Sequence, residues 1–185
     1  MEFVIKALGV LLLLAILGGF VFGIVCLVRL FIKLIKLKQP GIIKYYVMMI
    51  VCVVVMAASW LFNIGWYRVI LTWLAVPFVH PVVFFILNAV ALPNLIHSKK
   101  LKVYTLLTYV FFVFTYAFFP DGGDVGPAYV FFGLIKNDTA AHVLGVLSAV
   151  SLLAYIVFTI LQLAESGKVK RNISQENQNY IEKTR

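Results

Sequence analysis

The chain has 185 residues, of which 63% are hydrophobic and only 12% are charged, and its formal net charge at pH 7 is +9. A mean hydropathy of +1.03 excludes an ordinary water-soluble domain, because too few polar residues are present to cover its surface. The positive charge does not predict nucleic-acid binding, since most of the 16 Lys and Arg residues lie in three groups between or after apolar segments.

Five long uncharged segments, each about as long as a bilayer is thick, lie at 7–28, 45–66, 76–96, 103–119 and 142–164. We therefore predict an all-α fold. Residues 1–165 are expected to form a polytopic bundle of about five transmembrane helices, and residues 166–185 a disordered cytoplasmic tail.

The three groups of cations, at 29–44, 99–102 and 168–185, then fall on one side of the membrane. The positive-inside rule places the N-terminus outside and the C-terminus in the cytoplasm. The expected location is the plasma membrane or the bacterial inner membrane, with the lipid bilayer itself as one partner.

The first helix is expected to extend beyond the membrane through the sequence RLFIKLIKLK and to end before Pro40. The candidate lipid-binding cations there are Arg29, Lys33, Lys36 and Lys38. They either serve only to fix the topology or bind anionic lipid headgroups. The first interpretation is favoured, because the positive-inside rule already requires cations at this place.

The segment at 64–75 is apolar but contains Arg68, and Trp66, Tyr67 and Trp73 give it the aromatic residues typical of a membrane interface. We predict that this segment lies flat on the outer leaflet. Its indole rings and its one cation suit lipid headgroups better than hydrocarbon.

Polar side chains within the third and fourth spans are candidates for helix packing. Asn88 is expected to form an interhelical hydrogen bond, and the less favoured alternative is a selectivity or substrate contact. One helical stripe of the fourth span carries Thr105, Thr108, Tyr109, Thr115 and Tyr116. In lipid such a stripe is expected to face other helices.

The remaining polar groups gather on the predicted outer side. The candidates for partner binding are Arg68, His80, Asp121, Asp124, Asp138 and His142. Turn formation and helix capping explain most of them. Two functional interpretations stay open: a divalent metal site, which is disfavoured because no fixed ligand spacing occurs, and an outer recognition surface.

The sequence carries no enzymatic signature, and no Asp, Glu, Lys or Arg lies at the predicted mid-depth of any span. We therefore expect no catalytic residues, no metal and no cofactor. The leading hypothesis is a small non-catalytic membrane protein that binds a protein partner through its outer loop and its in-bilayer surface, as immunity-type or accessory proteins do. The alternative is a transporter or channel subunit for a neutral or lipid-like substrate. A third possibility is a membrane enzyme that acts on lipid through the outer His and Asp residues.

Overall fold

The structure is a computed structural model that describes residues 29, 40–63, 65–122 and 127–184. Arg29 is exposed on a helix. The predicted first span at 7–28 lies outside the described residues, as do Asp124 and the candidate lipid-binding lysines Lys33, Lys36 and Lys38.

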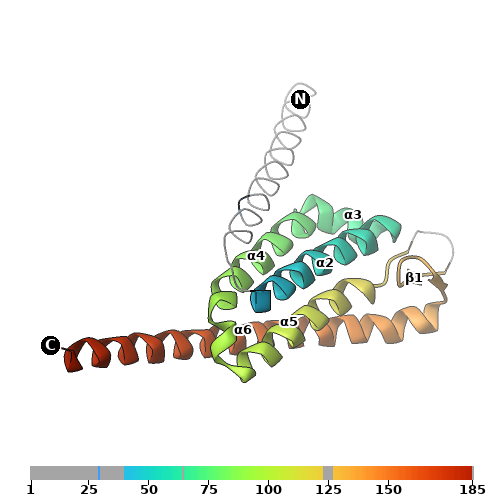
Figure 1. The fold of residues 1–185 in the computed structure, drawn as a ribbon. Helices are drawn as coiled ribbons and strands as arrows, with labels where there is room; N and C mark the ends of the chain where they lie inside the picture. The colour runs from blue at the N-terminus through green and yellow to red at the C-terminus, as the bar shows by residue number, and fades with distance from the viewer. Residues whose placement is uncertain (1–28, 30–39, 64, 123–126, 185) are drawn as a thin grey trace, which may run out of the picture.

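The described chain is almost entirely helical (Figure 1). Its elements are α2 (Pro40–Phe62), α3 (Trp66–Trp73), α4 (Val76–Ala91), the 3-10 helix η1 (Leu92–His97), α5 (Lys99–Ala117), β1 (Tyr129–Val130), β2 (Ile135–Lys136) and α6 (Asp138–Lys183). The prediction of an all-α class is confirmed, apart from a small hairpin in which β1 and β2 pair antiparallel.

Three of the described helical stretches are long and apolar enough to cross a membrane: Gly41–Phe62, Val76–His97 and α6. Helix α5 overlaps the predicted fourth span but is not among these stretches. Its first turn carries Lys99, Lys100 and Lys102, and its row of Thr and Tyr residues lowers its hydropathy further. The three stretches also expose large apolar side chains, such as Val54 and Leu153, which suits contact with lipid acyl chains.

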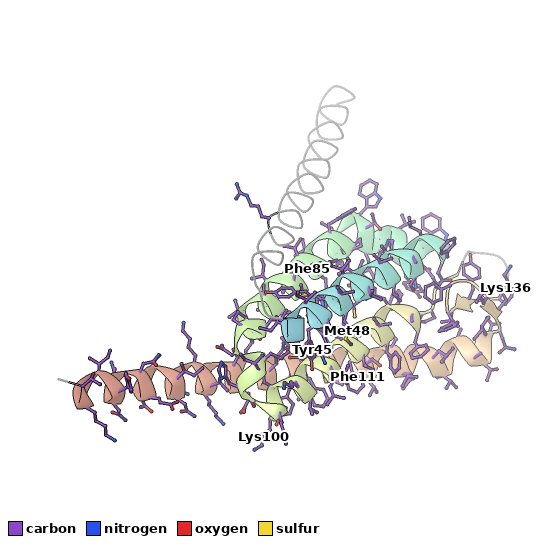
Figure 2. The ribbon with its side chains drawn as sticks, viewed as in Figure 1. Tyr45, Met48, Phe85, Lys100, Phe111 and Lys136 are labelled. Atoms are coloured by element: carbon purple, nitrogen blue, oxygen red, sulfur yellow. The ribbon has the colours of Figure 1, made fainter. Side chains whose placement is uncertain are left out.

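Helices α5 and α6 lie along each other, and α2 packs on α5 (Figure 1). The core between α4 and α5 is aromatic: Phe84 stacks on Phe112 with ring centroids 4.0 Å apart. Around it, partly buried side chains such as Tyr45, Met48 and Phe85 fill the space between the helices (Figure 2). The aromatic residues thus join helices that also carry buried polar groups.

The bundle has two chemically different ends, marked by Lys100 and Lys136 in Figure 2. Helix α5 begins at the end marked by Lys100. There Ser98 Oγ donates a hydrogen bond to Glu165 Oε1 of α6 at 2.8 Å. At the hairpin end lie α3, the two strands and the first residue of α6, Asp138.

The prediction of a disordered tail at 166–185 is wrong, because α6 continues without a break to Lys183 and passes beyond the rest of the bundle (Figure 1). Once the buried part of a helix has formed, each further residue adds a hydrogen bond without a new nucleation cost. Beyond Gly167 the segment contains no Gly or Pro that would stop this extension.

Candidate functional site at the hairpin end

The carboxylate of Asp121 closes the N-terminus of α3, although it lies more than 50 residues further along the chain. It accepts backbone N–H bonds from Gly65 (3.0 Å), Tyr67 (3.1 Å), Arg68 (2.9 Å) and its neighbour Gly122 (2.9 Å). Gly122 O accepts the remaining N–H of this first turn, from Trp66, at 3.2 Å. The carboxylate and the carbonyl together satisfy donors that a helix start leaves free, and the negative charge suits the helix dipole.

The guanidinium group of Arg68 donates hydrogen bonds to carbonyl oxygens at the C-terminal ends of two other helices. It donates hydrogen bonds to Ser59 O of α2, to Tyr116 O of α5 (3.2 Å) and to Phe119 O just beyond α5 (3.0 Å). Tyr116 O has no helical donor four residues on, because Pro120 lacks an N–H. Ser59 Oγ and Asn63 Nδ2 also donate to Tyr116 O and Phe119 O. The cation therefore adds charged donors where the carbonyl oxygens at helix ends are partly negative.

Both charged groups are buried, with 1% of each residue exposed. Their direct contact is loose, since Arg68 Nε and Asp121 Oδ2 are 3.9 Å apart, too far for a hydrogen bond. Burial lowers the pKa of Arg68 to about 10, and the nearby Asp121 carboxylate opposes that shift. The side chain thus stays cationic at neutral pH and also lies over the rings of Trp60 and Phe119.

Arg68 and Asp121, two of the candidates for partner binding, are therefore buried inside the protein. Neither residue is available to a partner as it stands, because each is occupied by backbone groups inside the protein. One sequence signal does point to the pairing: Arg68 is a rare cation on the predicted outer side, in an apolar segment where a charge needs a partner.

Above this buried pair lies a cleft of about 600 Å³ between α3, the segment after α5 and the start of α6. Trp66 and Tyr67 line it from α3, with 55% and 64% of their surface exposed. Asp138 and His142 line it from α6 and are also exposed. Asp138 Oδ1 additionally accepts the N–H of Ala128 at 2.8 Å, which ties the hairpin strand to α6.

His80 lies in α4, is partly buried and does not line the cleft. Its Nδ1 and Tyr116 Oη are 2.5 Å apart, and its ring packs edge-on against Phe112 and Tyr155. His80 and His142 both line a second groove, between α4, α5 and α6. Within the described ranges, no three His, Cys, Asp or Glu side chains are grouped so that they could hold a metal ion.

The polar stripe of α5 faces the other helices, as predicted: Thr105, Thr108, Tyr109, Thr115 and Tyr116 are all buried. Thr115 O accepts a hydrogen bond from Ser148 Oγ of α6 at 2.7 Å. This hydrogen bond joins α5 to α6, whereas Thr108 Oγ1 and Tyr109 Oη are buried without a hydrogen-bond partner among the described residues.

The predicted interhelical role of Asn88 is also confirmed, but its partner was missed. Gln162 of α6 donates through Nε2 to Asn88 Oδ1 at 2.9 Å and to Thr105 Oγ1 at 3.1 Å. This junction joins α4, α5 and α6, and 1% or less of each residue is exposed. Gln162 lies inside the predicted fifth span, on the same helical face as Ser148 and Ser151. This spacing in the sequence indicates a polar face that packs on other helices, and it could have identified Gln162 as a partner.

Replacing Gln162 by leucine should destabilise the bundle by about 1–2 kcal/mol, because Asn88 Oδ1 then loses its donor in a dry interior. The measurement is the detergent-induced unfolding midpoint in mixed micelles, followed by circular dichroism. Gln175→Leu, the same change on the exposed part of α6, is the matched control and should have little effect. Equal midpoints for the two variants would contradict the role assigned to this junction.

Comparison of the chain with protein-family models, with curated proteins and with solved structures found no match.

Proposed function

We propose that this protein is a small non-catalytic membrane protein that binds a protein partner through its hairpin end, as an immunity-type or accessory protein does. The observation that carries the proposal is the cleft above the Arg68–Asp121 pair, with exposed aromatic rings on one wall and exposed polar groups on the other. Recognition sites commonly combine aromatic anchors with a few fixed polar groups on a rigid support. In this protein the buried pair supplies that rigidity.

The hairpin beside the cleft adds a second argument. Phe131 and Phe132 have positive φ angles of 52° and 60°, in the left-handed region that glycine adopts more easily. Each costs on the order of 1–2 kcal/mol relative to an unstrained residue. Such strain tends to occur at functional sites, and the neighbouring Leu134 is 76% exposed. The turn thus presents apolar side chains next to the cleft.

The proposal includes a topology of five crossings with the N-terminus and the hairpin end outside and the tail in the cytoplasm. Its support is the distribution of cations along the chain. The hydrogen bond between Ser98 and Glu165 also brings the cations at 99–102 and the start of the cation group at 168–185 to one end of the bundle. A reporter that functions only in the cytoplasm should be active after Arg185 and inactive when inserted after Gly133. Activity at both positions would contradict this topology.

Partner binding can be tested by placing a photo-reactive phenylalanine analogue at Tyr67 in living cells of the native host. We expect one discrete cross-linked product, and about a tenfold weaker yield when Asp138→Asn or His142→Ala is added, because each change removes a polar contact from the cleft. Asp138→Asn keeps the oxygen that accepts the Ala128 N–H, so the hairpin stays attached.

Two controls make this experiment decisive. The photo-reactive residue at Val54, which is 61% exposed on α2 away from the cleft, should give no such product. Lys136→Met, at an exposed outer site that does not line the cleft, should leave the Tyr67 product unchanged. The same product from Val54, or none from Tyr67 under conditions where the protein is needed, would argue against a partner at this end.

The alternative is a transporter or channel subunit for a neutral or lipid-like substrate. The observation in its favour is the buried polar line along α5 and α6, which includes Thr105, Ser148 and Gln162. In that case Asn88→Leu should abolish uptake into proteoliposomes while Asp138→Asn has little effect. The partner-binding proposal expects the opposite order for activity in cells.

A further inference from the structure

A groove of about 630 Å³ opens between α4, α5 and α6 near the hairpin end. Its walls are mainly apolar and include Val76 of α4 and Ala149 and Leu152 of α6. Ala149 and Leu152 are exposed on α6, which is long and apolar enough to cross a membrane, so in a bilayer they would meet acyl chains. The groove is therefore accessible from the hydrocarbon side of the protein.

His80 and Tyr116 place a polar pair in this apolar groove. One ring nitrogen, Nδ1, is engaged with the Tyr116 hydroxyl. Among the described residues, the other nitrogen, Nε2, has no hydrogen-bond partner. When Tyr116 donates to Nδ1, the imidazole carries its proton on Nε2 and offers an N–H. His80 lines this apolar groove, and an N–H left unpaired in apolar surroundings is costly, so a ligand with an accepting oxygen is favoured there.

The position of the groove along the bundle narrows the class of ligand. Leu71 of α3 lines it, and α3 also carries exposed Trp66 and Trp73, the residues typical of the boundary between headgroups and hydrocarbon. The ester carbonyls of membrane lipids lie at this boundary, and their acyl chains extend from it into hydrocarbon. Among the described residues that line the groove there is no Lys or Arg, so it does not match a phosphate group.

We propose that this groove binds the acyl-ester segment of a membrane lipid. The ester carbonyl accepts the Nε2 proton of His80, and the acyl chain lies along Ala149 and Leu152. The site meets the partner cleft at Pro120, Ala141 and His142, which line both. Lipid bound in the groove would therefore also contact residues that line the partner cleft. The two sites can be tested separately.

The experiment uses the fluorescence of Trp60, which lines the groove, in the full chain carrying Trp66→Phe and Trp73→Phe. In maltoside micelles, which contain no ester, the protein is titrated with dibrominated methyl stearate, whose bromines quench tryptophan on contact. We expect saturable quenching by this ester, and only weak, non-saturable quenching by a dibrominated alkane of the same chain length.

Three variants test the assignment. His80→Phe keeps a ring but removes the donor and should weaken ester binding about tenfold. His80→Gln restores an N–H donor and should recover most of that loss. Ala149→Phe fills the groove and should abolish saturable quenching without touching the polar pair. Thermal unfolding of each variant identifies any that is misfolded.

Several outcomes would overturn the proposal. Equal quenching by the ester and the alkane would show that the polar pair plays no part. Saturable ester binding that survives Ala149→Phe would place the ligand elsewhere. Absence of saturable quenching in the folded parent protein would mean that the groove is filled by another part of the chain or does not select esters.

Discussion

Replacing Arg68 by methionine is expected to destabilise the protein by about 3–5 kcal/mol, a larger loss than Gln162→Leu should cause. Methionine fills much of the volume but removes the guanidinium hydrogen bonds to Ser59 O, Tyr116 O and Phe119 O, together with the cation beside the buried Asp121 carboxylate. Tyr116 O and Phe119 O each keep one weaker neutral donor, Ser59 Oγ and Asn63 Nδ2. The free energy of unfolding in mixed micelles measures the loss. Yield in the membrane fraction should fall with it.

A matched control and a double variant separate burial from charge. Lys136→Met removes an exposed cation from the same end of the protein and should be nearly neutral. In the pair Arg68→Met, Asp121→Asn, the loss should be smaller than the sum of the two single losses, since no lone buried charge remains. If Arg68→Met were as stable as Lys136→Met, the guanidinium group would have to lie in water.

Gly65→Ala should be the second most damaging change, with an expected loss of about 2–4 kcal/mol. A Cβ atom at this position would lie 2.3 Å from Asp121 Oδ1 and 2.7 Å from Gly122 O, so the carboxylate or the start of α3 must move. The backbone conformation is not the reason, because φ of Gly65 is −143° and suits any residue. The added methyl group instead breaks the contact that closes the helix N-terminus.

Gly41→Ala is the control for this prediction, since no atom of the described residues lies within 4 Å of a Cβ atom there. Alanine also favours helix more than glycine does, so this variant should match or slightly exceed the parent in stability. Thermal unfolding midpoints of the two variants provide the comparison. Similar midpoints would show that the gap between Gly65 and Asp121 is wider than the structure has it.

Local pattern was sufficient for the three described stretches that can cross a membrane and for the direction in which the polar side chains of α5 point. Apolar length predicts the stretches that can cross a membrane, and helical spacing predicts that the stripe from Thr105 to Tyr116 faces inward. Both are properties of one segment, so they can be read without knowing its neighbours. The segment predicted to lie at the interface forms the helix α3, and its arginine is buried inside the protein.

What only the tertiary structure decided is which distant groups meet. Arg68 and Asp121 are 53 residues apart, and Gln162 and Asn88 are 74 apart, so no spacing rule links them. Whether a charged side chain is exposed or buried depends on the partner that the fold brings to it, because an unpaired charge is excluded from the interior while a satisfied one is stable there. The tail at 166–185 also depends on the rest of the fold. Its composition favours disorder, but it continues the packed helix α6, so no new helix has to be nucleated.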